Sequence, residues 1–272
     1  MQKTILITGA TDGIGLETAR KLVAQDHNLL LHGRSQEKLD RVKTELSKIA
    51  GKGFLETYLA DLSDLRKVDE LAEAVLAKHQ KLDVLINNAG ILKSSQPITS
   101  DGLDVRFVVN TLAPYRLAQR LNDIIGTSGR IINLSSAAQA PVNLAAMSGQ
   151  VDMDAMDAYS QSKLAITMWS MQLARQTGSP IVIAVNPGSL LGSKMVKEGF
   201  GMEGHDLAIG ADILVRAALS EEFAQHSGEY FDNDSGRFSA PHTDALDAAK
   251  TAAVVQRIDD VINQVLIQKE NA

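Results

Sequence analysis

The 272-residue chain contains no cysteine, which excludes disulfides, thiolate nucleophiles and Cys-ligated zinc. Its six histidines are scattered, and no two stand at the spacing of metal ligands, so we expect no metal site. No apolar run approaches the roughly 18 residues that a membrane-spanning helix needs, and the N-terminal segment turns polar too early for a secretory signal. The lack of a membrane-spanning run and of a secretory signal predicts a soluble cytoplasmic protein.

The chain also lacks an excess of positive charge, because its formal net charge is −6. Nucleic acid or an anionic membrane as the main partner would favour a basic face, so we expect neither. Apolar residues make up 44% and charged residues 22%, as in ordinary globular proteins. No linker divides the sequence. We therefore expect one domain that spans residues 1–272.

Short apolar runs alternate with longer segments of helical period. This alternation predicts an α/β fold: a doubly wound parallel sheet (Rossmann fold) with helices on both faces. Right-handed crossovers place the carboxyl ends of such strands on one rim, and ligands bind outside that rim. We expect strands at 3–8, 28–33, 53–60, 81–88, 129–136 and 180–187, and helices after Gly13, from Ser35, and at about 64–79, 101–122 and 156–177.

A glycine-rich turn, TGATDGIG at 8–15, joins the first strand to the first helix. Gly9 permits a tight turn, while Gly13 and Gly15 remove side chains where the backbone approaches a pyrophosphate at the helix N-terminus. The spacing Gly-x-x-x-Gly-x-Gly differs from the commoner Gly-x-Gly-x-x-Gly form. A turn that binds nothing is the alternative, but its position after the first strand favours nucleotide binding.

Arg34 follows the second strand, where dinucleotide-binding folds meet the adenosine ribose. A carboxylate at this point holds the 2′-hydroxyl of NAD, whereas an arginine accepts the 2′-phosphate of NADP. No acid stands at 32–34, so the sequence favours NADP over NAD. The alternative is a solvated surface arginine.

Polar residues end the next two strands. Asp61 is either a partner of the adenine edge or a capping aspartate, and its residue type leaves the choice open. Asn87, Asn88, Ala89 and Gly90 close the fourth strand. Because asparagine and glycine are poor strand formers, this segment indicates a task in holding backbone or ligand.

Tyr159 and Lys163 are four residues apart and therefore share one face of the predicted helix. A nearby ammonium favours phenolate over phenol and lowers the tyrosine pKa. The pair Ser135 and Ser136 ends the fifth strand, where a hydroxyl can donate to a carbonyl oxygen, although serines also end strands without a function. Asn110 lies within a predicted helix, where asparagine is not favoured, and this hints at another task.

Taken in order, these motifs resemble the short-chain dehydrogenase/reductase family. The resemblance spans most of the chain and implies about seven strands, a bound nicotinamide cofactor, and hydride transfer between its ring and an alcohol or carbonyl carbon. The segments that carry it are TGATDGIG, NNAG at 87–90, Asn110, SSAA at 135–138, YSQSK at 159–163 and Asn186-Pro187-Gly188.

The resemblance also implies roles for single residues. Tyr159 would be the general acid/base, and Lys163 would lower its pKa and hold the nicotinamide ribose. Ser136, the second serine of the pair, would orient the substrate oxygen, and Asn110 would support a proton-relay water. The expected cofactor-binding residues are Gly9, Thr11, Gly13, Ile14, Gly15, Arg34, Asp61, Leu62, Asn88, Ala89, Gly90, Tyr159, Lys163, Pro187 and Gly188.

The chain departs from the family pattern at two places. The gap from Ser136 to Tyr159 is 23 residues, which indicates an insertion at 143–157 and resembles the retinol-dehydrogenase-like branch. The threonine that often follows Pro-Gly is absent, and Ser193 is the nearest such hydroxyl beyond Ser189. We expect 143–157 and the glycine-rich 189–208 to form the substrate pocket, the second as a lid. The alternative is that these segments cover the core edge or a subunit contact.

The main prediction is therefore an NADP(H)-dependent oxidoreductase that reduces a small, mostly apolar carbonyl compound or oxidises the alcohol. The runner-up is an NADP(H)-binding redox-sensing protein, which would not need Tyr159 and Lys163 together. A sugar-nucleotide epimerase or dehydratase is a third reading, but about 80 residues after Pro187 leave little room for the extra substrate domain. The sequence leaves open whether the protein forms a homo-oligomer.

Overall fold

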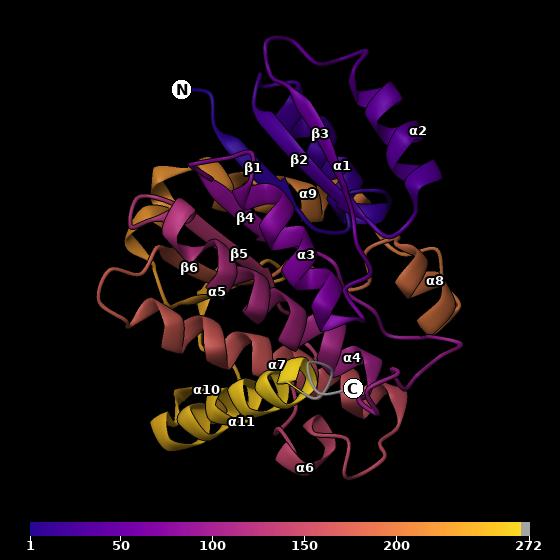
Figure 1. Cartoon of the computed structure of the whole chain (residues 1–272), viewed down its shortest axis with the longest axis vertical. Helices are drawn as coiled ribbons and strands as arrows, with labels where there is room; N and C mark the ends of the chain where they lie inside the picture. Colours follow the sequence, from indigo (N-terminus) through magenta and orange to yellow (C-terminus); the bar gives the residue numbers. More distant parts are fainter. Residues whose placement is uncertain (268–272) are drawn as a thin grey trace.

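A twisted sheet divides the described part of the chain, residues 1–267, into two helical layers (Figure 1). In the computed structural model the strand order is β3-β2-β1-β4-β5-β6-β7-β8, and every pair is parallel except β7 with β8. The strands are β1 (Thr4–Ile7), β2 (Asn28–Gly33), β3 (Leu55–Leu59), β4 (Val84–Asn87), β5 (Arg130–Leu134), β6 (Ile181–Asn186), β7 (Tyr230–Asp232) and β8 (Arg237–Ser239).

Successive strand residues point to opposite faces, and each face has its own apolar core. Ile5 and Ile7 of β1 pack with one core, and Leu6 packs with the other. The core that contains Ile5 lies under α1 (Gly13–Val23), α2 (Gln36–Leu46) and α9 (Leu207–Leu219). The core that contains Leu6 lies under α3 (Leu65–Leu76), α5 (Ala113–Ile125) and α7 (Ala155–Ala174). This strict alternation explains the continuous apolar strands of the sequence.

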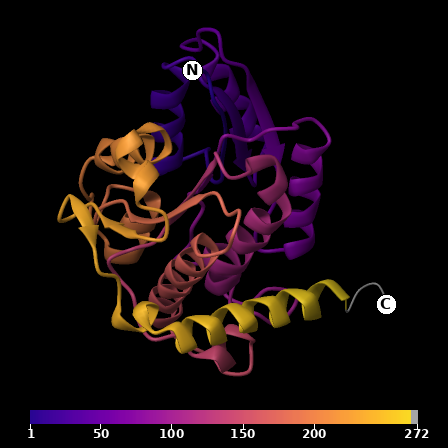
Figure 2. The same ribbon diagram turned by 90° about the vertical axis from the view of Figure 1, so that its left-hand side faces the viewer.

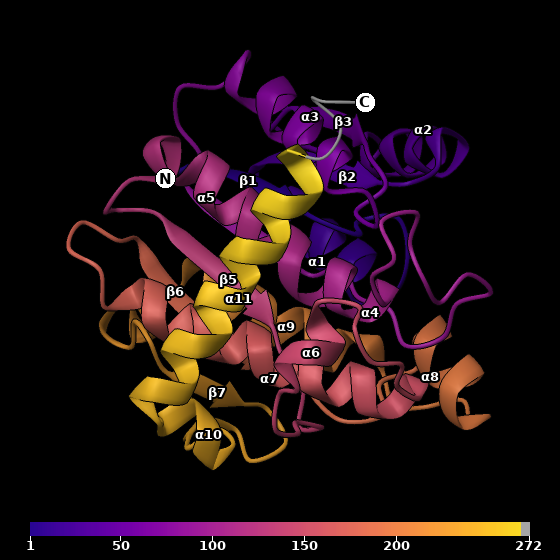
Figure 3. The same ribbon diagram turned by 60° about the horizontal axis from the view of Figure 1, so that its bottom comes forward.

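The C-terminal helix α11 (Ala248–Ile267) forms an additional cover outside α7. It runs across that layer in two perpendicular views, and its buried face, including Val254, Ile258 and Ile262, joins the larger core (Figures 2 and 3). The remaining short elements are α4 (Val105–Phe107), η1 (Val108–Leu112), α6 (Leu144–Met147), α8 (Lys194–Phe200), η2 (Glu221–Gln225) and α10 (Thr243–Leu246). No helix in residues 1–267 is long and apolar enough to cross a membrane.

The doubly wound α/β prediction is confirmed, with two corrections. The sheet has eight strands in the described residues, not about seven, because β8 adds an antiparallel edge. Three residues, Arg237–Ser239, are too few to show a strand pattern. The helix expected over 101–122 begins only at Val105, where the side chain of Asp104 caps its first turn, and it continues to Ile125 through a π-helical segment.

Candidate active site

The glycine turn at 8–15 is held by Asn88, which directly follows the neighbouring strand β4. Gly9 and Gly13 have φ of +66° and +54°, which glycine adopts without strain. The Asn88 amide donates to the carbonyl oxygens of Thr8 at 2.8 Å and Gly9 at 3.2 Å. A Cβ on Gly15 would stand 2.4 Å from both the Asn88 amide nitrogen and the Gly9 carbonyl oxygen. The contact between Asn88 and the turn therefore leaves no room for a side chain at position 15.

His32 fixes the same turn from β2, a role that sequence reasoning missed. The Gly9 N–H donates to His32 Nδ1 at 3.2 Å, so the proton sits on Nε2, which donates to the Ala60 carbonyl at 3.1 Å. Burial lowers the pKa of His32 to about 4, and the ring is therefore neutral. It ties together the ends of β1, β2 and β3. In the sequence, the one indication of this role is the position of a histidine within an apolar strand.

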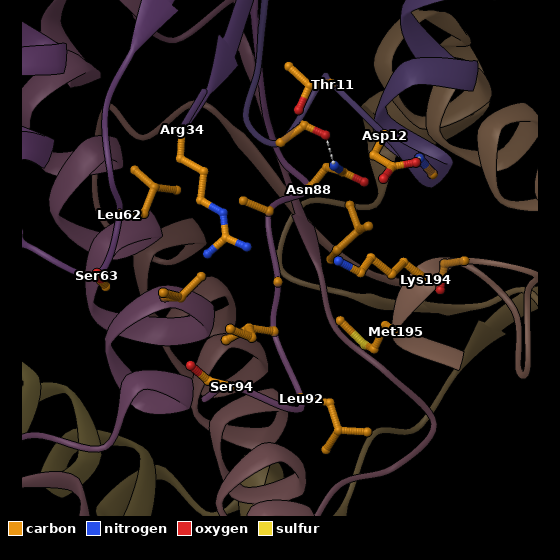
Figure 4. A pocket seen from close by; sticks show the side chains of 18 of the residues that line it. Thr11, Asp12, Arg34, Leu62, Ser63, Asn88, Leu92, Ser94, Lys194 and Met195 are labelled. Carbon is orange, nitrogen blue, oxygen red and sulfur yellow. Dashed lines mark hydrogen bonds between the residues drawn. The ribbon is translucent and has the colours of Figure 1, made fainter. Parts of the chain in front are cut away.

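A groove of about 420 Å³ runs along the rim formed by the carboxyl ends of the strands, as expected for an open parallel sheet (Figure 4). It gathers most of the predicted cofactor residues from five separate strand ends. Those in its lining are Gly9, Thr11, Gly13, Ile14, Arg34, Asp61, Leu62, Asn88, Ala89, Gly90, Tyr159, Lys163 and Pro187. Four predicted site residues do not line the groove but directly follow a lining residue in the chain: Gly15, Asn110, Ser136 and Gly188.

The guanidinium of Arg34 projects into this groove (Figure 4). Within residues 1–267 this side chain makes no hydrogen bond and no ion pair, so its donors are available to a ligand in the groove. Lys38 and Ser63 line the groove beside it. Asp61 accepts hydrogen bonds from the N–H and hydroxyl of Ser63 at 3.0 and 2.8 Å. It therefore shapes this turn while it lines the groove, and the cap of α3 is Asp64 instead.

Tyr159 and Lys163 lie on one face of α7, as their spacing predicts. Lys163 is 4% exposed, and its ammonium donates to the Leu134 carbonyl at 2.7 Å and lies 5.7 Å from the centre of the Tyr159 ring. Burial lowers the pKa of Lys163 to about 8. Burial also raises the pKa of Tyr159, against the opposing effect of a hydrogen bond with Ser136. The direction differs from the lowering implied by the family resemblance, because desolvation outweighs the neighbouring groups.

The two serines after β5 have different environments. The hydroxyl of Ser135 is buried, donates to the Lys163 carbonyl at 3.1 Å and lies 2.6 Å from the Thr167 hydroxyl, so it braces α7. Ser136 is partly exposed, and its oxygen accepts from the Ala138 N–H at 3.1 Å and bonds to the Tyr159 side chain. Ser135 is therefore the serine that lines the groove, and Ser136 is the one that contacts Tyr159.

Asn110 links the end of β4 to α7. Its Oδ1 accepts from the Ile91 N–H at 2.8 Å, and its amide donates to the Ile91 carbonyl at 3.0 Å and the Ser162 hydroxyl at 2.9 Å. It sits in the π-helical segment η1, a distortion that is frequent at functional sites. Neither this distortion nor the partner Ser162 was visible in the sequence.

A family model described as short chain dehydrogenase matches residues 3–204. The chain belongs to the short-chain dehydrogenase family.

Relatives and solved structures agree with this assignment. Retinol dehydrogenase 13 of Homo sapiens is 30% identical over 276 residues, covering 91% of this chain and 81% of that protein. The structure of an angucycline C-6 ketoreductase with bound NADP is 27% identical, with a TM-score of 0.64, and the match covers 85% of this chain and 93% of that one. A short chain dehydrogenase from Burkholderia cenocepacia in complex with NADP shares the fold, at 24% identity and a TM-score of 0.67, covering 86% and 97%. The predicted resemblance to the retinol-dehydrogenase-like branch is confirmed.

The two expected substrate segments of this short-chain dehydrogenase differ in position. From 189–208, Ser193, Lys194, Met195 and Glu198 line the groove. In the described chain no residue of 143–157 does so. Met147 of this segment is fully buried in the core, whereas Val151 and Met156 are exposed, so the role expected for 143–157 stays a prediction.

Proposed function

We propose that this dehydrogenase is an NADP(H)-dependent oxidoreductase that reduces an apolar carbonyl compound or oxidises the corresponding alcohol. One arrangement carries the proposal: Arg34, Tyr159 and Lys163 line the same groove, and Ser136 contacts the Tyr159 side chain beside it. The NADP complexes among similar structures support the choice of cofactor.

The residues present fit NADP(H). The glycine turn presents backbone at the N-terminus of α1, where a pyrophosphate is favoured, and Arg34 can bind the 2′-phosphate bidentately. The Lys163 ammonium is the donor available for the nicotinamide ribose. When bound, the cofactor supplies or accepts the hydride.

In the direction of reduction, Ser136 donates a hydrogen bond to the substrate oxygen, and Tyr159 delivers its phenolic proton to that oxygen as negative charge develops. Lys163 then stabilises the resulting phenolate. A Cβ on Gly90 would stand 3.5 Å from both Asn110 Oδ1 and Lys163 Nζ, so these groups flank one small space. A water in that space would return a proton from solvent towards the tyrosine.

The segment 189–208 provides the substrate side of the proposal. Met195 of this segment lines the groove together with Leu92, and methionine suits an adaptable apolar surface (Figure 4). We propose that this segment acts as a lid and that the substrate is apolar. The cytoplasmic location expected from the sequence stays a prediction.

The test is an NADPH-oxidation screen over aldehydes, ketones, quinones and steroids. We expect turnover of apolar carbonyl compounds, lost in Tyr159→Phe and kept in the control Tyr58→Phe, whose hydroxyl bonds to Glu56 away from the groove. Tight NADPH binding without turnover of any class would instead support the redox-sensing alternative. No NADPH binding would refute both.

A further inference from the structure

The turn between β7 and β8 contacts both ends of the lid, residues 189–208. The Asn233 amide donates to the carbonyl of Pro187 at 2.9 Å and to that of Ile209 at 3.3 Å, on either side of the lid. Asp234 accepts from the Ser189 N–H at 2.8 Å and from the Ser189 hydroxyl at 2.5 Å. Two adjacent side chains therefore hold the points where the lid leaves and rejoins the fold.

Asp234 is itself held in place by β6. The Asn186 amide donates to one of its oxygens at 2.9 Å and to Asp232 at 2.8 Å. Burial alone would raise the pKa of Asp234, but its hydrogen bonds with Ser189 and Asn186 produce a net lowering. The carboxylate is thus ionised at neutral pH and remains an acceptor for the lid.

The two stems of the lid also meet each other directly. Gly192 N–H donates to the His205 carbonyl at 2.6 Å, and His205 N–H donates to the Leu190 carbonyl at 2.7 Å. Leu190 has φ of +52°, a backbone conformation that a leucine adopts rarely and that its surroundings must enforce. Leu190 is held on both sides, because the preceding Ser189 donates two hydrogen bonds to Asp234 and the Leu190 carbonyl accepts from His205.

We propose that Asn233 and Asp234 form a clamp that positions the lid over the nucleotide groove. This inference rests on the proposed function, in which the groove binds NADP(H). Neither residue lines the groove, whereas Ser193, Lys194 and Met195 of the lid do. The clamp therefore acts on binding only through the lid, and both are positioning residues. The short hairpin of β7 and β8 at the sheet edge therefore contributes to ligand binding through the lid.

Loss of the clamp lowers the fraction of molecules whose lid is in the binding position, and the apparent Kd rises by the inverse of that fraction. Asn233→Ala removes two hydrogen bonds to residues that flank the lid, and Asp234→Ala removes two hydrogen bonds to Ser189, the first residue of the lid. Since one hydrogen bond contributes a factor of about 2 to 10, we expect the Kd for NADPH to rise about tenfold. The rate of the chemical step on bound substrate should change less than KM.

The experiment compares Asn233→Ala, Asp234→Ala and the control Ser235→Ala by backbone amide hydrogen exchange and NADPH titration. Ser235 lies in the same turn, but its hydroxyl donates to the Asp232 carbonyl and not to the lid. We expect faster exchange in 189–206 for the two clamp variants, unchanged exchange in β5 and α7, and wild-type behaviour of the control. Asp234→Asn, which keeps one acceptor oxygen, should lie between Asp234→Ala and wild type.

If the lid amides exchange as slowly in both clamp variants as in the Ser235→Ala control, the clamp proposal is refuted. So would faster exchange spread evenly over the whole protein, because that result indicates a purely structural hairpin. Amide exchange needs no cofactor, so the clamp is tested even if the wild-type protein binds no NADPH. In that case the proposed function fails, and the lid result still stands by itself.

Discussion

Replacing Lys163 with methionine should make the cofactor-free protein more stable while it abolishes turnover. The ammonium is almost fully buried, and its pKa falls from 10.5 to about 8. At about 1.4 kcal/mol per pKa unit, this shift corresponds to a desolvation penalty of roughly 3 kcal/mol for the charged form. Methionine fills a similar volume without a charge.

The variant also loses the hydrogen bond from Lys163 to the Leu134 carbonyl, which contributes about 1 kcal/mol net. The expected gain in unfolding free energy at pH 7 is therefore about 2 kcal/mol, or a rise in Tm of roughly 4–8 °C for a domain of this size. If the variant is more stable but inactive, the Lys163 charge serves the reaction and does not stabilise the fold.

The pH dependence gives a second check. The folded-state pKa lies below the unfolded one, so the penalty is present in full below pH 8 and disappears as the pH rises from about 8 to 10.5. The wild type gains stability over this window, and the difference between wild type and Lys163→Met narrows.

Urea unfolding followed by circular dichroism at pH 7, 8, 9 and 10 measures both effects. Lys197→Met is the matched control, because this lysine of α8 is half-exposed and pairs with Glu203 on the surface. Its stability should stay within about 0.5 kcal/mol of wild type. A Lys163→Met protein that is less stable than wild type at pH 7, or a gap that does not narrow with pH, would refute the reasoning.

Five further substitutions test the site and its surroundings. Arg34→Ala should weaken NADPH binding about 10- to 150-fold and leave NADH unchanged, as titration of both cofactors would show; equal wild-type affinities contradict this. Tyr159→Phe should lower kcat about 10²- to 10⁴-fold with cofactor affinity intact, whereas a tenth of the activity remaining would assign the proton elsewhere. Gly15→Ala should abolish cofactor binding, because its Cβ would overlap the Asn88 brace; normal NADPH titration argues against that overlap. Met195→Ala should change kcat/KM for the best screened substrate, whereas Met147→Ala, in the core, should reduce stability by about 2–5 kcal/mol; an unchanged kcat/KM for the first would remove the lid from the substrate pocket.

The sequence alone determined the features that depend on neighbouring residues. Strand and helix periods set the α/β fold, and the position of each motif after a strand was enough to place Gly9, Arg34 and Asn88 on one rim. The four-residue spacing of Tyr159 and Lys163 was enough to place both on one helix face. These predictions succeeded because a helix or strand pattern and a right-handed crossover leave few arrangements.

Only the tertiary structure decided the features that join distant parts of the chain. Asn88 explains why Gly15 has no side chain, and His32 joins three strand ends; neither contact has a local pattern. The eighth strand is too short to be read from sequence, yet its turn brings Asp234 to Ser189, 45 residues earlier. Likewise, only the structure shows that Met195 lines the groove and that Met147 lies in the core. The sequence cannot distinguish two methionines, because they differ only in what packs around them.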